Sequence, residues 1–553
     1  MTKYSKPILL HPRSVTLLLL TGCITLFSEV ALVASDLRVQ DIQVSHDGVQ
    51  FVWEGTPGGI YTIESAEYLA PYDTFAPLLE NIPATGILTT NNFPLGPDPY
   101  RYFRVMEQGS DANRLGKVVL MSDFHMSPFL NRATTEALVT NDISLWDGLF
   151  ATTTNGFFTR DATGDRTTTP LLFNSALSNA RAACPHPDAI IVPGDFPYYN
   201  FISLYTNITQ TSDVQQGKDL LVKTIKYSLM KIRQAFPNAP VYFALGNNDT
   251  FLGDYDIATS GDEFYTRTAE VFYDGPFTNV LDYAAFTATY TNTGNYSAPF
   301  GRGGIITLQS LYFSINYPRS LDAGSNQLTC LEAELQKSAA TNRHVWLLFH
   351  IPPGINAYAT WSHWQTNDTN YVATDWRPEF LTSFCAIVSR YTNTISGIFC
   401  GHYHNRGWQL LSDPVNSNAV ATVQISNGLL FNHGNNPGIT ILTYDRNTLA
   451  LVSENTYSLD YTTWYGSLDS AAPWSIRYSQ NQGGRIPDLG PSSLLSAWTA
   501  MRATTSDGFR SYNNEYSGGR TPLLCTASNW PVYYNTIRWT TPQQFLDNAR
   551  PHR

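Results

Sequence analysis

Residues 118–125, with the sequence VVLMSDFH, decide the fold of this chain. Four apolar residues in succession predict a short strand that is buried on both faces, as strands of parallel sheets are. Asp123 and His125 follow directly, so they would leave this strand at its carboxyl end. Ligands of open α/β sheets bind at the carboxyl ends of the strands. The stretch therefore combines a core strand with two candidate ligand residues.

Four further apolar runs repeat this arrangement along the chain. They are residues 189–192, 241–245, 345–349 and 395–399, and each ends in a polar cluster. Helical patterns separate them, for example over residues 219–236 and 330–338. This alternation predicts an α/β domain whose strand ends collect the polar clusters at one edge.

Acidic, amide and imidazole side chains fill these clusters. They are Asp123 and His125, Gly194 and Asp195, Asn247 with Asn248 and Asp249, His350, and His402 with His404. A lone Gly-Asp pair is usually a turn, but core packing does not explain five such clusters behind five strand-like runs. Buried groups of this kind need partners. Two divalent cations about 3.5–4 Å apart would bind such nitrogen and oxygen ligands and share a carboxylate between them.

In this order, the five clusters resemble the motifs of the calcineurin-like metallophosphoesterases, over residues 117–445. The resemblance implies an α/β catalytic domain, a β-sandwich flanked by helices, that binds two divalent metal ions. Zinc is the first choice of metal, with iron or manganese as alternatives. The implied ligands are Asp123, His125 and His404 for the first ion, Asp195 as the bridge, and Asn247, His350 and His402 for the second. A hydroxide that bridges the ions would attack phosphorus in line.

Shorter segments narrow the resemblance to the acid sphingomyelinase-like phosphodiesterases. They are TPLLFNSAL at residues 169–177, HIPPG at 350–354 and NPG at 436–438. Thr456, Tyr457 and residues 474–478 (WSIRY) resemble the start of that family's C-terminal helical region. The resemblance implies an enzyme that hydrolyses phosphodiesters, with a small-molecule or lipid-like substrate. The six-cysteine saposin module of the true sphingomyelinase is missing, so nothing here favours extraction of lipid from a membrane.

One position departs from the family pattern, because Asn248 stands where these enzymes usually have a histidine. An amide donates hydrogen bonds but does not release a proton near neutral pH. Either another group protonates the leaving oxygen, with His363 and His433 as candidates, or the natural leaving group is already acidic. The remaining alternatives are a phosphomonoesterase on the same site, or a weakly active or non-catalytic metal-binding surface protein. The candidate catalytic residues are Asp195, Asn248 and Asp249, the last of these more suited to supporting the metal ligands.

Two groups of aromatic residues each allow more than one role. Gly194, Asp195 and Tyr198 match the Gly-Asp-x-x-Tyr motif of purple acid phosphatases, whose tyrosine binds ferric iron. That family lacks the histidine that this chain has at position 125, so we expect Tyr198 to line the pocket instead. The five aromatic residues of the 355–376 loop would either stack on a substrate group or pack within the protein.

Composition excludes several classes of protein. The 553 residues include 34 Lys and Arg and 45 Asp and Glu, and 34 − 45 gives a net charge of −11. Charged residues make up 14 % and aromatic residues 13 % of the chain, which excludes a disordered protein. An acidic chain without a basic run is not expected to bind a nucleic-acid polymer.

The first 35 residues predict export. Lys3, Lys6 and Arg13 precede an apolar run that starts at residue 14, the pattern of a signal peptide. Residues 20–23 (LTGC) resemble a lipoprotein signal that would place a lipid on Cys23, whereas Val33, Ala34 and Ser35 suit ordinary cleavage. The expected location is periplasmic, cell-surface or secreted, with a membrane contact only through a lipid at Cys23.

The predicted organisation has four parts. They are a signal peptide or lipoprotein signal over residues 1–35, a small all-β sandwich over 36–108, the catalytic domain over 113–455, and a partly helical C-terminal region over 456–553. No Cys-x-x-Cys spacing occurs among the six cysteines, which argues against a thiolate zinc site. The sequence leaves the disulfide pairing and the oligomeric state open.

Overall fold

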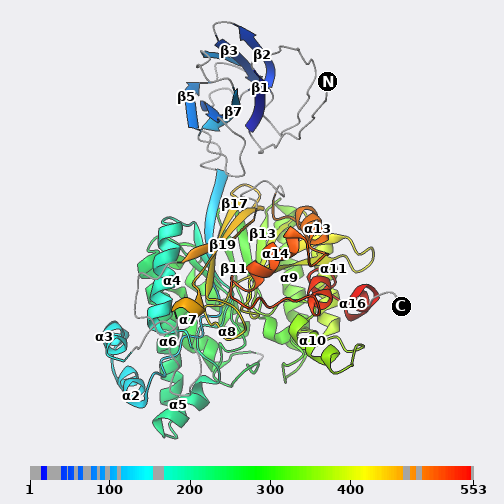
Figure 1. The fold of residues 1–553 in the computed structure, drawn as a ribbon. Helices are drawn as coiled ribbons and strands as arrows, with labels where there is room; N and C mark the ends of the chain where they lie inside the picture. The colour runs from blue at the N-terminus through cyan, green and yellow to red at the C-terminus, as the bar shows by residue number, and fades with distance from the viewer. Residues whose placement is uncertain are drawn as a thin grey trace. The chain divides into compact units, whose positions relative to one another are not determined.

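The computed structural model describes seven strands between residues 14 and 108, and residues 114–153, 167–258, 260–464, 474–480 and 488–549. Contacts divide the chain into two compact units. The first contains residues 1–115 and 482–487, and the second contains residues 116–481 and 488–553. Figure 1 draws the described part of the first unit in blue, and the second unit from cyan to red.

The described part of the first unit is all β. One sheet has the strand order β1 (Ser14–Leu20), β7 (Tyr100–Gln108), β4 (Ile60–Ala66), β5 (Ala76–Pro83), and the other has β2 (Val39–Ser45), β3 (Gly48–Glu54), β6 (Leu88–Phe93). Trp53 and Tyr61, one from each sheet, are buried with ring centroids 5.8 Å apart. The sheets therefore pack together as the predicted small sandwich. Strand β1 falls inside the segment that the sequence assigns to an export signal, while Cys23 and residues 33–35 lie outside the described residues.

Two six-stranded sheets form the centre of the second unit. Sheet I has the order β10 (Val241–Phe243), β9 (Ala189–Val192), β8 (Leu115–Leu120), β17 (Gly438–Asp445), β18 (Leu451–Ser458), β19 (Ser475–Gln480). Sheet II has the order β11 (Ser297–Phe300), β12 (Gly303–Thr307), β13 (Val345–Leu348), β14 (Ile395–Cys400), β16 (Ala419–Ile425), β15 (Gly407–Ser412). All five apolar runs are strands, which confirms the α/β prediction.

The two sheets pack face to face, with parallel strands at the heart of each. Strands β8, β9 and β10 are parallel in sheet I, and β12, β13, β14 and β16 are parallel in sheet II. Trp346 of β13 and Tyr444 of β17 meet between the sheets with ring centroids 5.0 Å apart, and both are buried. This is the β-sandwich that the sequence predicts.

Helices cover both outer faces of the sandwich. Helix α4 (Pro170–Ala183) contacts β17 of sheet I, and α11 (Pro378–Arg390) contacts β16 of sheet II. In Figure 1, α4 and α6 (Val214–Ala235) lie to one side of the strands, and α9 (Asp322–Ala340) and α11 to the other. Helix α4 begins where the sequence dictates, because the Thr169 side chain accepts from the Leu172 N–H at 3.2 Å and Pro170 takes the first helical position.

Shorter helices complete the second unit. They are α2 (Arg132–Thr140), α3 (Trp146–Ala151), α5 (Phe201–Thr209), α7 (Glu263–Tyr273), α8 (Tyr283–Thr293), α10 (Ala357–Gln365), α12 (Tyr461–Trp464), α13 (Pro491–Ala500), α14 (Asp507–Tyr516), α15 (Trp530–Arg538) and α16 (Pro542–Ala549). Helices α13, α14 and α15 contact the β15–β16 edge of sheet II. Within the described residues, no helix has the length and apolar character that a membrane span requires.

One boundary differs from the prediction. Residues 456–458 and 475–478, expected to begin a helical region, lie in β18 and β19, which pair antiparallel and extend sheet I. Side chains of β18 alternate between buried and half-buried, as the two faces of an edge region require, and the Thr456 hydroxyl lies 2.9 Å from that of Thr440. The short helix α12 lies between these two strands, and the longer helices of this region begin with α13. The five cysteines of the described residues, Cys184, Cys330, Cys385, Cys400 and Cys525, are all free.

Candidate metal centre

The candidate ligands lie on the loops that leave the carboxyl ends of five strands. Asp123 and His125 follow β8, Asp195 follows β9, Asn247 follows β10, His350 follows β13, and His402 and His404 follow β14. The strands are buried throughout their last residues, so the loops start from fixed positions. All seven predicted side chains converge on one place, although they span 282 positions of the sequence.

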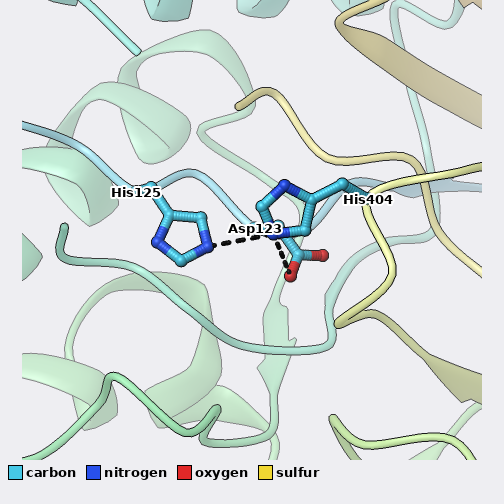
Figure 2. Close-up of side chains that lie close together, drawn as sticks. All are labelled: Asp123, His125 and His404. Atoms are coloured by element: carbon cyan, nitrogen blue, oxygen red, sulfur yellow. Dashed lines mark hydrogen bonds and ion pairs between the residues drawn. The ribbon is translucent and has the colours of Figure 1, made fainter. Parts of the chain in front are cut away.

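Asp123, His125 and His404 form the first group (Figure 2). The Nε2 atoms of the two histidines lie 3.2 Å apart, and His404 Nε2 lies 3.4 Å from Asp123 Oδ1. Asp195 lies next to this group, because its Oδ2 atom is 3.3 Å from His125 Nε2. The same oxygen is also 3.3 Å from His350 Nε2. Asp195 is thus in the position of a ligand shared between two ions.

Asn247, His350 and His402 form the second group. Asn247 Oδ1 lies 2.9 Å from His350 Nε2 and 2.9 Å from His402 Nδ1. Asp123, Asp195 and His350 also bring one possible ligand atom each within 4.8 Å of one another. Three donor atoms that meet at such distances are arranged as they would be around a cation.

Hydrogen bonds from outside the group fix which atom each ligand presents. His350 Nδ1 donates to the Pro193 carbonyl at 2.9 Å, so Nε2 is the nitrogen that faces Asn247 and Asp195. His402 presents its other ring nitrogen, Nδ1, to Asn247, and its Nε2 lies 3.1 Å from the Tyr255 hydroxyl. The amide nitrogen of Asn247 donates to Asp254 Oδ1 at 2.6 Å, which turns the amide oxygen inward. Such outer contacts orient metal ligands in general.

The backbone is strained at most of these positions. Positive φ angles occur at Asp123 (49°), His125 (42°), Asp195 (59°), His402 (74°) and His404 (60°). Each costs on the order of 1 kcal/mol or more in a residue other than glycine, and such strain gathers at ligand clamps. Close packing also demands a glycine at 246, where a Cβ atom would lie 2.1 Å from Asp195 Oδ1. The chain therefore keeps a costly local geometry to bring these side chains together.

Burial sets the charge states of the histidines. It lowers the pKa of His125 to about 4 and that of His402 to about 3, against the nearby charge of Asp195. It also lowers the pKa of His404 well below the ordinary value. These imidazoles are therefore neutral near pH 7, which is the form that binds a metal ion.

His350 and the carboxylates behave differently. Burial opposes a charge on His350, but Asp195 and Asp123 raise its pKa to about 9. Burial also opposes ionisation of Asp195, yet the charges of His350 and His125 lower its pKa. Burial raises the pKa of Asp123 to about 7, an effect that His350 opposes and Asp195 reinforces.

The donor set fits divalent cations. Carboxylate, amide and neutral imidazole ligands suit zinc, iron and manganese. The facing Nε2 atoms of His125 and His404 bring two lone pairs together, and within the described residues the Nδ1 atom of neither ring has a hydrogen-bond partner. An ion bound to both Nε2 atoms would account for their close approach.

Asn248 and Asp249 support Asp195. The backbone N–H of Asn248 donates to Asp195 Oδ1 at 2.8 Å, and its side-chain amide donates to Oδ2 at 2.9 Å. Asp249 is fully buried and accepts the N–H groups of Gly246 (2.6 Å), Asp195 (2.9 Å) and Phe196 (3.1 Å). Asp249 thus ties the loops after β9 and β10 to each other.

A cavity of about 640 Å³ opens beside the cluster. Asp195, Asn247, His402 and His404 line one part of it, and aromatic side chains such as Trp408, Tyr512, Tyr516 and Tyr533 line another. Of the five aromatic residues in the 355–376 loop, only Tyr358 lines the cavity. Trp361 and Trp364 instead pack against Val532 and Phe545, and Trp376 is fully buried. Packing within the protein therefore explains most of that loop.

The two tyrosines that follow the Gly-Asp motif have different surroundings in the structure. Tyr198, the expected lining residue, is buried, and its neighbour Tyr199 lines the cavity. His433 also lines the cavity. His363 does not line the cavity. Its ring stacks on that of Tyr371, with ring centroids 3.7 Å apart. Sequence reasoning overlooked Tyr199, Asp254 and Tyr255. Only Tyr199 had a signal, namely its place four residues after Asp195.

Comparisons with known proteins agree with this geometry. Residues 116–406, more than half of the chain, match the calcineurin-like phosphoesterase family model, so the chain belongs to that family. It is a hydrolase acting on phosphoester bonds, and the family together with the two ligand groups indicates divalent metals.

Two curated relatives and one solved structure show what the chain is similar to. Human acid sphingomyelinase-like phosphodiesterase 3b is 23 % identical over 369 residues, 64 % of this chain and 75 % of that protein. Cyclic GMP-AMP phosphodiesterase SMPDL3A of Mus musculus is 27 % identical over 307 residues, 54 % of this chain and 64 % of that protein. The structure of PhoD superposes with a TM-score of 0.40 at 12 % identity, over 80 % of this chain and 89 % of that one. The predicted family is confirmed.

Proposed function

We propose that this chain is a metal-dependent phosphodiesterase. Its ligands are Asp123, His125 and His404 for one ion, Asn247, His350 and His402 for the other, and Asp195 for both. The convergence of these seven side chains beside one cavity carries the proposal. We propose zinc as the metal, with iron or manganese as alternatives, because imidazole ligands outnumber carboxylates.

Bound ions would lower the pKa of a coordinated water towards about 7 and offset the charge of the phosphoryl oxygens. The chain itself holds the ligands in place. Asn248 orients the Asp195 carboxylate through two hydrogen bonds, and Asp249 accepts the backbone N–H groups of Gly246 and Asp195. Asp254 and Tyr255 fix the ligand atoms of Asn247 and His402.

The extent of the cavity supports diesters over monoesters. A phosphomonoester has one substituent, and its phosphate would lie at the ligand cluster. The cavity continues from there to Trp408 and to Tyr512 and Tyr533 of the C-terminal helices, which offers room for a second substituent. Both named relatives are phosphodiesterases, and their activity supports the same choice for this chain.

We also propose that the protein is exported. The basic residues before residue 14 and the cleavage patterns at 20–23 and 33–35 support this. Because β1 contains part of the apolar run, cleavage at either site would remove a strand of the first unit. Mass determination of the protein from its own cells distinguishes cleavage at residue 23 with a lipid, cleavage near residue 35, and an intact N-terminus.

Two substrates test the proposed reaction. We expect the zinc-loaded protein to hydrolyse bis(4-nitrophenyl) phosphate faster than 4-nitrophenyl phosphate, and a chelator to stop both reactions. His402→Ala should lose the activity, whereas His363→Ala should keep it, because His363 does not line the cavity. Turnover of the monoester alone would show a phosphomonoesterase. Two bound ions without turnover of either ester would show a non-catalytic metal-binding protein.

A further inference from the structure

We propose that the hydroxyl group of Tyr199, held by His433, donates a hydrogen bond to the substrate oxygen that departs from phosphorus. This role deepens the proposed function and rests on it. Three observations carry it: the orientation of Asn248, the place of Tyr199 in the cavity, and the fixed position of His433.

Asn248 does not face the cavity. Asn248 is 4 % exposed, and its side-chain amide donates one N–H group to Asp195 Oδ2. Asn248 is also missing from the residues that line the cavity. The position that usually carries a histidine therefore supplies no donor to the substrate here, and another side chain must do so if the departing oxygen is to be stabilised.

Tyr199 has the place that such a donor needs. Its ring lies against His125, with ring centroids 4.2 Å apart, and it lines the cavity together with Asp195 and His404. A phenol hydroxyl is both a donor and an acceptor, and it keeps its proton near neutral pH. Tyr199 is thus a neutral O–H donor at the edge of the candidate metal centre.

His433 fixes the hydroxyl of Tyr199. The Tyr199 oxygen lies 3.3 Å from His433 Nε2. If Nε2 carries the hydrogen, the imidazole donates to the phenol oxygen, and the phenol O–H group is left to donate to the substrate. The ring of His433 in turn lies edge-on to His404, with centroids 4.2 Å apart. Tyr199 therefore lies against His125, and His433 lies against His404.

The loop that carries His433 is itself held in place. The Leu430 N–H donates to the Asp123 carbonyl at 3.2 Å, and Arg520 donates to the carbonyl groups of Phe431 (3.0 Å) and Asn435 (3.1 Å). His433 therefore keeps a defined distance from the ligand cluster, so the pair is preorganised for a substrate oxygen.

The chemistry needs no additional reactant. As a water oxygen forms its bond to phosphorus, the bond from phosphorus to the leaving oxygen breaks, and that oxygen takes the bonding electrons. A hydrogen bond from Tyr199 becomes stronger as this negative charge develops, which lowers the barrier. The phenol keeps its proton throughout, the attacking water releases one proton to solvent, and the departing alkoxide or phenoxide takes one proton from solvent.

Tyr199→Phe tests the proposal with two diesters of different leaving ability. The hydrogen bond matters most for a poor leaving group, so kcat for diphenyl phosphate should fall about 10- to 100-fold, the loss expected for one donor to a charged oxygen. For bis(4-nitrophenyl) phosphate, which releases a stable anion, kcat should fall less than about threefold. Tyr205→Phe is the matched control, since its hydroxyl donates to Gln216 at 2.8 Å and Tyr205 does not line the cavity.

Metal content and His433→Gln complete the test. Both variants should bind as much zinc as the wild type, and His433→Gln should reproduce part of the Tyr199→Phe effect. An equal loss on both diesters, or a loss of zinc, would overturn the proposal, because Tyr199 would then act on the fold or the ligands. Absence of turnover in the wild type would instead contradict the proposed function.

Phosphate binding gives a readout that does not require turnover. Inorganic phosphate offers a fourth oxygen at the position of the leaving group. Titration of the zinc-loaded proteins with phosphate should show about tenfold weaker binding to Tyr199→Phe than to wild type or Tyr205→Phe. Equal affinities in all three proteins would overturn the proposal.

Discussion

Replacing Asp254 with alanine should weaken one of the two metal sites and leave the other unchanged. Asp254 does not belong to the proposed ligands, but its Oδ1 atom accepts from the Asn247 amide at 2.6 Å. That bond makes the amide oxygen, rather than the nitrogen, point at His350 and His402. Without it, the amide is free to rotate and to present its N–H group, which cannot bind a cation.

The size of the effect follows from this single contact. A hydrogen bond to a charged group contributes about 1.5–3 kcal/mol, and about 1.4 kcal/mol corresponds to a factor of ten in affinity. We therefore expect the dissociation constant of the Asn247 site to rise about 10- to 100-fold, the range usual for residues that orient metal ligands. The site of Asp123, His125 and His404 should keep its affinity.

Competition titration of the metal-free protein with zinc and a chromogenic chelator measures both constants. Asp256→Asn is the matched control, because Asp256 lies two residues away and pairs with Arg319 at 2.6 Å instead of with a ligand. Two unchanged constants in Asp254→Ala, or an equal change in Asp256→Asn, would refute the proposed orienting role of Asp254.

Three further predictions concern the same region. Burial raises the pKa of Asp375 to about 6, so its charged form is disfavoured in the folded state. The free energy of unfolding should therefore fall by about 2 kcal/mol between pH 4 and pH 6 on its account, and urea unfolding of Asp375→Asn should lack this loss. Identical pH profiles would contradict it. Gly246→Ala should lower the free energy of unfolding by about 3 kcal/mol or more, because the added Cβ atom would lie 2.1 Å from Asp195 Oδ1. A stable variant with full zinc content would contradict this packing. Asn248→His should raise kcat on diphenyl phosphate by no more than about threefold, since Tyr199 already supplies a donor. The substitution also removes the hydrogen bond from the Asn248 amide to Asp195. A large gain would show that a proton donor is missing.

Five parallel strands of the second unit, β8, β9, β10, β13 and β14, were predictable because each contains a largely apolar run. Strands β12 and β16 were not, because glycine and polar residues interrupt them. The run before Asp123 forms β8, and the runs before Asp195 and Asn247 form its parallel neighbours β9 and β10. Buried strand ends then place the following residues at one edge, which is why the convergence of the seven candidate ligands also followed from the sequence.

Other features depend on packing that periodicity does not encode. Strands β18 and β19 contain many polar residues, so their pairing at the edge of sheet I gives a weak apolar pattern. Which of Tyr198 and Tyr199 lines the cavity depends on the backbone turn that begins at Asp195, whose φ angle is 59°. Asp254 reaches Asn247 through the fold of a loop rather than through a strand, so no spacing in the sequence reveals the contact.

Anomalous X-ray diffraction from crystals of the zinc-loaded protein, recorded at the zinc absorption edge, tests the central claim most directly. We predict two peaks about 3.5–4 Å apart, one next to His125 and His404, the other next to Asn247 and His402, and both adjacent to Asp195. A single peak, or zinc bound away from Asp195, would contradict the dinuclear centre.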